Sequence, residues 1–143
     1  MLNILRNILA IFLGLFIGGC VNMALITLSP SIIPPPAGVN VTDPESLGKF
    51  IHLFEPRHFL MPFLAHALGT LVGALVAYLI AGSRKAAMAY VIGVAFLCGG
   101  IAACFMIPAP IWFMAVDLLF AYLPMAWLAI QIGARMTQGK TGA

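Results

Sequence analysis

This sequence has very little charge. Asp, Glu, Lys and Arg make up 8% of its 143 residues, whereas hydrophobic residues make up 63% and the mean hydropathy is +1.10. A soluble domain carries about 25% charged residues, and a small soluble domain keeps a large fraction of its residues at the surface. The composition therefore excludes a water-soluble fold and favours a chain that is surrounded by the apolar interior of a lipid bilayer.

Three long stretches lack charged residues altogether. They lie between Arg6 and Asp43, between Arg57 and Arg84, and between Lys85 and Asp117. A helix needs about 20 mainly apolar residues to cross roughly 30 Å of hydrocarbon. We place four membrane spans, at about 8–28, 60–81, 86–107 and 110–133. The alternation typical of barrel strands is also missing, so we predict one all-α domain over residues 1–143, an integral membrane four-helix bundle.

The basic residues are divided unequally between the two sides of the predicted bundle. If the chain weaves back and forth, five of the seven fall on one side: Arg6, Arg84, Lys85, Arg135 and Lys140. Lys49 and Arg57 fall on the other side. Because short cytoplasmic loops carry an excess of Lys and Arg, we expect both termini to be cytoplasmic. We expect a multi-pass protein of a bacterial inner (plasma) membrane.

Cysteine is scarce and shows no pairing motif. Cys20, Cys98 and Cys104 all lie in predicted spans and no CxxC occurs, so we interpret them as small packing residues. Arg6 and the residues before Cys20 loosely resemble the start and cleavage site of a lipoprotein signal. The apolar run continues to Leu28, however, beyond the roughly 7–15 residues of a signal core. We therefore expect the first span to be retained.

The longest connection, the outer loop at 29–59, contains a predicted short helix. Two helix starts fit the sequence: Asp43 as the cap with Pro44 at the first helical position, or a capping box of Thr42 and Glu45. The apolar residues that follow share one helical face; they are Leu47, Phe50, Ile51 and Phe54. We predict an amphipathic helix that either lies on the outer membrane surface or forms a lid over the bundle.

Three polar residues fall inside the predicted spans at a similar depth. Asn22, His66 and Asp117 each lie about six or seven residues from the outer end of a span, which places them about 9–11 Å below the outer boundary. A carboxylate at the middle of a membrane helix costs about 2.5–3.5 kcal/mol, and such groups usually find partners in the bundle interior. We expect the three side chains to meet and satisfy one another. The cluster is then a ligand or proton site, or else a structural hydrogen bond between helices.

Small residues indicate how the first two spans pack. Gly14 and Gly18 are four residues apart on the first span, and Gly69 and Gly73 are four residues apart on the second. Such small-xxx-small patterns allow two membrane helices to approach closely. If these faces meet in antiparallel fashion, Asn22 and His66 lie at the same end. The same pattern can also drive association between two chains.

Pro124 lies within the fourth span, seven residues after Asp117. Proline removes a backbone donor and bends a helix. We therefore predict a kink in this span near Pro124.

Several polar residues gather at the end of the outer loop: His52, Glu55, Arg57 and His58. Histidine and carboxylate side chains can bind zinc, but this spacing matches no strong metal motif, and we assign no metal. Two other interpretations remain. The residues form a solvated face, or they form a polar cap with Arg57 or His58 reaching down towards Asp117.

The short signatures of common enzymes are missing. There is no HExxH, P-loop, GxSxG or dinucleotide fingerprint. A bis-histidine haem needs a second intramembrane histidine besides His66, which only a homodimer would supply. We expect no cofactor, and no nucleic-acid partner because the chain has no large basic surface.

Three functions remain open. The leading hypothesis is a non-enzymatic membrane component that binds a partner, a lipid or a small hydrophobic ligand in the outer half of the bundle. The second is an oligomeric proton- or ion-coupled transporter that uses Asp117 and His66. The third is a membrane enzyme or quinone-binding subunit with the same two residues as acid–base groups. The expected partners are the lipid bilayer and further copies of the chain or a larger membrane complex.

Overall fold

The computed structural model describes residues 1–107 and 109–138, and all regular structure in them is helical. Four helical stretches are long and apolar enough to cross a membrane: Leu2–Ile32, Pro56–Ile80, Lys85–Met106 and Ile111–Gln138. The prediction of an all-helical chain with four helices of membrane-spanning length is therefore confirmed. Pro108 and the polar end of the chain, including Lys140, lie outside the described residues.

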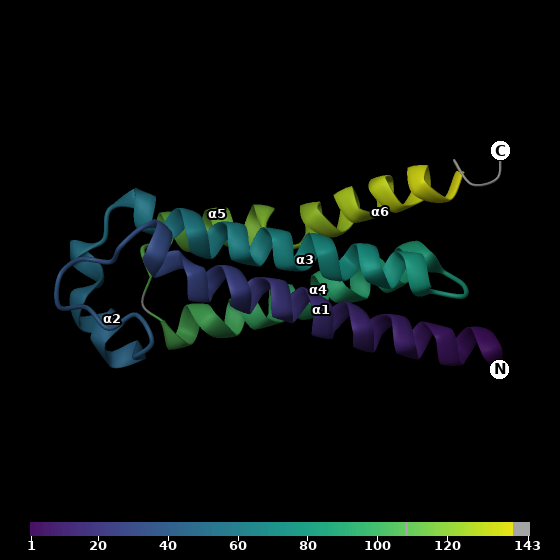
Figure 1. The fold of residues 1–143 in the computed structure, drawn as a ribbon, viewed down its shortest axis with the longest axis horizontal. Helices are drawn as coiled ribbons and strands as arrows, with labels where there is room; N and C mark the ends of the chain where they lie inside the picture. Colours follow the sequence, from purple (N-terminus) through teal and green to yellow (C-terminus); the bar gives the residue numbers. More distant parts are fainter. Residues whose placement is uncertain (108, 139–143) are drawn as a thin grey trace.

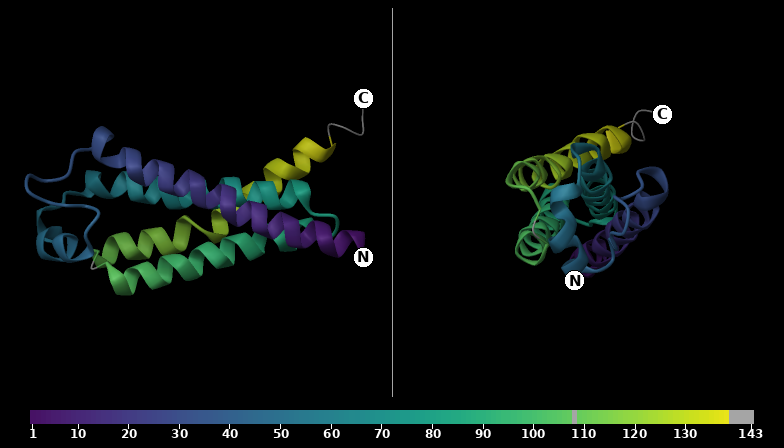
Figure 2. Two further views of the ribbon diagram at one scale, coloured as in Figure 1. Left: turned by 60° about the horizontal axis from the view of Figure 1, so that its bottom comes forward. Right: turned by 90° about the vertical axis from the view of Figure 1, so that its left-hand side faces the viewer.

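The long helices run side by side along one axis (Figure 1). In chain order the elements are α1 (Leu2–Ile32), α2 (Pro44–Phe50), η1 (Ile51–Leu53), η2 (Pro56–Phe59), α3 (Leu60–Ile80), α4 (Lys85–Met106), α5 (Ile111–Phe120) and α6 (Leu123–Gln138). The start of α1, the turn between α3 and α4, and the last turns of α6 lie at one end of the molecule. The loop that carries α2 lies at the other end, across the tips of the long helices (Figure 2).

The first helix is longer than the predicted span at 8–28. It runs from Leu2 to Ile32 and includes Pro30 near its end. The connection between the first two membrane-spanning helices is correspondingly shorter, at 33–55 rather than the predicted 29–59. At α2, Asp43 is the cap: its carboxylate accepts hydrogen bonds from the backbone N–H groups of Glu45 and Ser46 at 3.1 and 3.3 Å.

Helices α1 and α3 pack backbone against backbone through glycine. A Cβ atom added to Gly14 would lie 2.7 Å from the carbonyl oxygen of Gly73, and one added to Gly18 would lie 2.6 Å from that of Gly69. No side chain fits at these distances, so the two helices approach as closely as glycine permits. As the chain advances along α1 from Gly14 to Gly18, the contacting glycine on α3 moves back from Gly73 to Gly69, so the helices are antiparallel. This places Asn22 beside the turn of α3 that carries His66.

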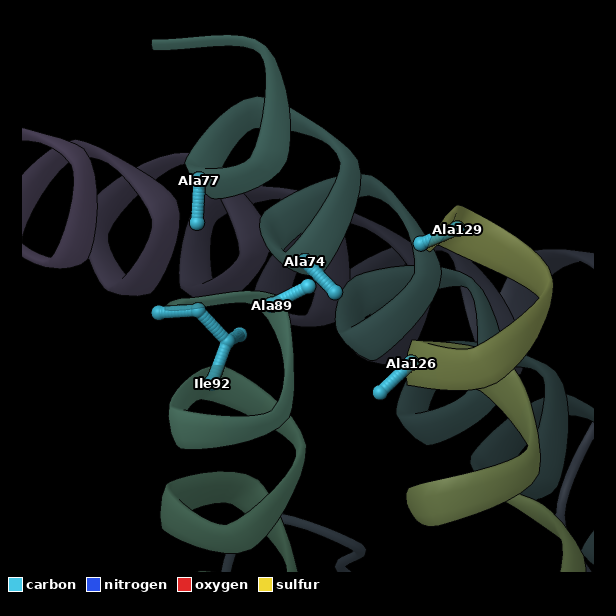
Figure 3. Packing of buried hydrophobic residues seen from close by; sticks show 6 residues of the cluster. All are labelled: Ala74, Ala77, Ala89, Ile92, Ala126 and Ala129. Carbon is cyan, nitrogen blue, oxygen red and sulfur yellow. The ribbon is translucent and has the colours of Figure 1, made fainter. Parts of the chain in front are cut away.

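Alanine fills the centre where α3, α4 and α6 converge. Five of the six fully buried residues of this cluster are alanines, and the sixth is Ile92 (Figure 3). Such small side chains let three helices approach one another closely, and in lipid this packing replaces the hydrophobic driving force between helices.

Polar side chains hold together the end where α1 begins. The side-chain oxygen of Asn7 accepts hydrogen bonds from the backbone N–H groups of Gly82 at 3.0 Å and Ser83 at 3.2 Å. Arg6 donates to the carbonyl oxygen of Ile80 at 3.1 Å. These bonds tie α1 to the tight turn between α3 and α4.

The fourth span is two helices and not one kinked helix. Helix α5 ends at Phe120 and α6 begins at Leu123, so the break falls at Ala121 and Tyr122, before Pro124. Pro124 is the second residue of α6, where the missing N–H needs no partner within the helix. In place of the predicted kink near Pro124, the helix is interrupted completely two to three residues closer to Asp117.

Candidate functional site

A buried carboxylate, an imidazole and a phenol meet between α3 and α5. Asp117 on α5 is 3% exposed. Its two carboxylate oxygens lie 2.9 and 3.0 Å from Nδ1 of His66 on α3. The hydroxyl of Tyr122 donates to Oδ2 of Asp117 at 2.7 Å. We call these three side chains the polar cluster.

The helix break brings Tyr122 to Asp117. In a continuous α-helix, side chains three and four residues apart are neighbours, whereas residues five apart point in directions about 140° apart at 3.6 residues per turn. The interruption at Ala121–Tyr122 removes this constraint. Tyr122 is then 1% exposed, with its hydroxyl on the carboxylate and its ring stacked on His66 at 5.9 Å between centroids.

The orientation of His66 is fixed from one side only. Nδ1 points to Asp117, and Thr70 donates to the backbone carbonyl of His66 at 2.8 Å. Nε2 has no hydrogen bond in the described part of the chain. Every buried side-chain nitrogen or oxygen there does have a partner, so Nε2 is not among the buried atoms. Nε2 is therefore accessible from outside the polar cluster.

His66 lines a cleft between α1, α3 and α4 with a volume of about 330 Å³. Much of its wall is made of small residues, among them Gly19 on α1 and Gly99 on α4. A Cβ atom added to either glycine would have no atom within 4 Å. The cleft therefore has an apolar wall with open space, and polar groups from His66, Tyr122 and Asn22.

Asn22 does not join the polar cluster. Its side chain lines the same cleft as His66, but within the described residues it makes no hydrogen bond. Its Cβ atom packs against Gly69, where an added Cβ would be 2.9 Å away. The expectation that Asn22, His66 and Asp117 satisfy one another is therefore wrong for Asn22, and Tyr122 takes its place.

Sequence reasoning missed Tyr122, although a signal existed. A tyrosine two residues before a proline in an apolar span carries a hydroxyl that needs a partner in lipid. Because five residues separate Tyr122 from Asp117, helical periodicity placed the two on different faces.

The polar residues of the outer loop do not reach Asp117. Arg57 pairs with Glu55 at 2.9 Å, and both side chains are more than half exposed, at 66% and 61%. Nδ1 of His58 accepts a hydrogen bond from the backbone N–H of Glu55 at 2.9 Å. His52 is also exposed. Of the two interpretations, the cap over the Asp117 pocket does not form, because these side chains make local bonds that shape η2. No group of three or more potential metal ligands occurs in the described residues.

A second cavity lies beneath the loop that carries α2. Its volume is about 520 Å³, and it is bounded by the end of α1, the 44–59 segment and the start of α5. Leu47, Ile51 and Phe54 line it, so one apolar face of the 44–59 segment is turned towards the bundle. We call it the loop cavity.

The arrangement is suited to holding a ligand through one nitrogen atom. Since Tyr122 donates to the carboxylate of Asp117, the carboxylate is also the acceptor for Nδ1–H of His66. Nε2 then presents a lone pair to the cleft when the imidazole is neutral, and an N–H when it is protonated. Among the described residues that line the cleft there is no serine, threonine, cysteine or lysine to act as a nucleophile. No protein-family model, no curated protein and no solved structure matches this chain.

Proposed function

We propose that this protein is a non-enzymatic membrane component that binds a lipid-soluble ligand in the cleft between α1, α3 and α4. The observation that carries the proposal is His66, which is held by Asp117 through Nδ1 and turns Nε2 to an apolar cleft. An ionisable group in a membrane span is expensive and is usually functional. A structural bond between the helices needs only Nδ1, whereas a binding role also accounts for the position of His66 in the wall of the cleft.

The size and chemistry of the cleft support this function. A volume of about 330 Å³ lies at the lower end of the range of small-molecule pockets, about 300–1,000 Å³. Such pockets are mostly apolar with a few placed polar groups, as here with Nε2 of His66 and the amide of Asn22. The ligand is therefore an apolar molecule with at least one hydrogen-bonding group, which enters from the bilayer.

The position of the ligand in the membrane follows from the charges. We propose that the end with Arg6, Arg84, Lys85 and Arg135 is cytoplasmic, in accord with the positive-inside rule. The chain start, the turn between α3 and α4, and the last turns of α6 lie together at that end (Figure 1). The cleft then occupies the outer half of the bundle.

We also propose that the 44–59 segment is a lid on the bundle and not a helix lying on the membrane surface. Its support is the loop cavity, where Leu47, Ile51 and Phe54 face the ends of the long helices. In a surface helix the same residues would face lipid.

Co-purification tests the binding function. The protein is extracted in native lipid nanodiscs, and bound lipid-soluble molecules are identified by mass spectrometry of the organic extract. Gly99→Leu adds a side chain to the wall of the cleft at a position where a Cβ atom meets nothing within 4 Å, and it is expected to remove the ligand. Ala102→Leu, on the exposed face of the same helix, is the matched control and should retain it. An extract that is identical for the two variants would rule out binding in the cleft.

Proton-coupled transport is the second candidate, because Asp117 and His66 form a buried carboxylate–imidazole pair beside a cleft. Proteoliposomes distinguish the two functions. If an oligomer of this chain is a transporter, Asp117→Asn abolishes a proton-driven flux that the original protein shows. The absence of flux under any gradient, together with ligand retention, leaves binding as the function.

A further inference from the structure

The cleft and the loop cavity adjoin each other, and we call the two together the channel. Met23 lines both. In three places, a residue of the cleft is followed four positions further outward by a residue of the loop cavity: Met23 by Thr27 on α1, His66 by Pro62 on α3, and Ala103 of α4 by Ile107, the residue that follows α4. Four residues are about 6 Å along a helix. The two cavities are thus stacked one helical turn apart between the same helices.

Helix α1 presents one continuous stripe to this channel. The stripe begins with Leu15 and Gly19 in the cleft, passes Met23, and continues with Thr27 and Pro30 in the loop cavity. Steps of three or four residues keep these positions on one helical face. From the first to the last, the stripe is about 22 Å long. The lining that α1 contributes to the two cavities is therefore elongated along the bundle.

Nε2 of His66 and the amide of Asn22 lie at the cleft end and have no hydrogen-bond partner among the described residues. In the loop cavity, Thr27 donates to the carbonyl of Met23 at 2.7 Å, and Thr42 donates to the side chain of Asn40 at 2.7 Å. Ser29 and His58 also line this cavity, where the Ser29 hydroxyl and Nε2 of His58 have no partner among the described residues. The loop cavity lies at the end of the bundle, within reach of water, whereas His66 lies between the long helices (Figure 2). An elongated amphiphile therefore gains most when its polar end is at His66, because an unpaired polar group is costly where no water replaces the missing bond.

The channel lining also limits the charge of its occupant. The described residues that line the two cavities include no lysine and no arginine. A phosphate or carboxylate group buried there would lack a fixed cation, and an unpaired buried charge is strongly unfavourable. The lining therefore favours a neutral hydroxyl or carbonyl group over an anionic headgroup.

We propose that one single-chain lipid with a neutral hydrogen-bonding end occupies the channel from His66 outward. Its polar end binds Nε2 of His66 and the amide of Asn22, its chain passes Met23, and its far end lies beneath Leu47, Ile51 and Phe54. This inference rests on the proposed binding function and adds the class of ligand and the role of the lid. The apolar face of the lid keeps water away from the chain.

Photochemical labelling tests the proposal. The probe is a hexadecanol analogue with a diazirine and an alkyne near its methyl end, incorporated into nanodiscs that contain the full-length protein. Labelled residues are identified by tandem mass spectrometry after irradiation. The expected labels fall on the lid residues Leu47, Ile51 and Phe54. The corresponding hexadecanoate probe, which carries a carboxylate, should label them less.

Met23→Trp tests whether the two cavities are connected. The larger ring closes the passage, so lid labelling should fall at least about tenfold, the factor expected when about two methylene groups are withdrawn from an apolar site. Met106→Trp is the matched control, because Met106 is exposed and lines neither cavity. Both variants are first checked for native elution and helix content.

The outcomes separate this inference from the proposed function. Labels that stay on lipid-facing residues such as Phe12 and Phe105, with a native ligand still lost in Gly99→Leu, would overturn the single-channel proposal alone. Equal lid labelling in Met23→Trp and Met106→Trp would overturn it as well. If Gly99→Leu also retains all of its bound molecules, the binding function fails together with it.

Discussion

Each member of the polar cluster depends on the other two. Asp117 accepts hydrogen bonds from Tyr122 and His66, and these bonds replace the water that a carboxylate would otherwise bind. The loss of one donor leaves a lone pair of the carboxylate unsatisfied in an apolar environment. The energetic consequence of a substitution here therefore exceeds the small net value of an ordinary hydrogen bond.

Tyr122→Phe is expected to lower the free energy of unfolding by about 1–3 kcal/mol, the cost of leaving a buried acceptor unsatisfied. The ring and its packing are unchanged, so the hydroxyl alone is tested. Unfolding is measured in mild detergent by denaturant titration. In a double-mutant cycle with Asp117→Asn, the two effects should be non-additive; strictly additive losses would contradict the bond.

Gly100 and Gly99 form a natural pair for testing the position of Tyr122. A Cβ atom added to Gly100 would overlap the ring and hydroxyl of Tyr122, whereas one added to Gly99 meets nothing within 4 Å. Both changes to alanine favour the helix by a similar amount, up to about 1 kcal/mol. Gly100→Ala is expected to be less stable than Gly99→Ala in thermal melts. Equal melting temperatures would place Tyr122 elsewhere.

At the scale of elements, the contact between α1 and α3 decides where the cleft forms. Glycines at positions 14, 18, 69 and 73 bring the two backbones together, so this pair of helices behaves as one unit. Gly19 is adjacent to Gly18 in sequence but points to the cleft. The same helix thus packs against α3 with one face and lines the cleft with the next.

Gly18→Ala should therefore destabilise the protein where Gly19→Ala does not. The added methyl group at Gly18 would lie 2.6 Å from a backbone oxygen of α3, which cannot move without shifting a helix. Overpacking of this kind costs about 1–3 kcal/mol. Denaturant titration of both variants measures the difference, and a Gly18→Ala variant as stable as Gly19→Ala would exclude the close contact.

The whole molecule has two chemically different ends. One end carries Arg6, Arg84 and Lys85 and is held together by side-chain bonds to the turn between α3 and α4. The other end carries the loop cavity and the mixed charges of the 44–59 segment. This difference between the ends supports the proposed orientation in the membrane.

Accessibility to a membrane-impermeant maleimide measures that orientation. In a variant without native cysteines, Glu45→Cys in the loop should react in right-side-out vesicles. Met136→Cys near the end of α6 should react only after permeabilisation; both positions are exposed in the folded chain. The opposite pattern would reverse the topology, and reaction of both in intact vesicles would place the two ends of the bundle on one side.

The sequence by itself indicated an apolar solvent and four apolar helical stretches. Uncharged runs such as that between Arg57 and Arg84 predict membrane-spanning helices, because the cost of an unpaired backbone group in lipid leaves the chain few alternatives. The glycine spacing on the first two spans predicts a close helix pair, since that property depends on residues four apart on a single helix. Both are local properties.

Only the tertiary structure decided how the polar side chains meet. A similar depth in the membrane placed Asn22 beside His66 and Asp117, yet depth says nothing about the rotation of each helix, and Asn22 packs against Gly69. The break at Ala121–Tyr122 interrupts the helix, so residues after it no longer follow the helical spacing of residues before it. The mean hydropathy of the fourth span does not reveal this break, although the break brings the Tyr122 hydroxyl to the Asp117 carboxylate. The loop cavity likewise depends on where the 44–59 segment lies, which is set by contacts distant in sequence.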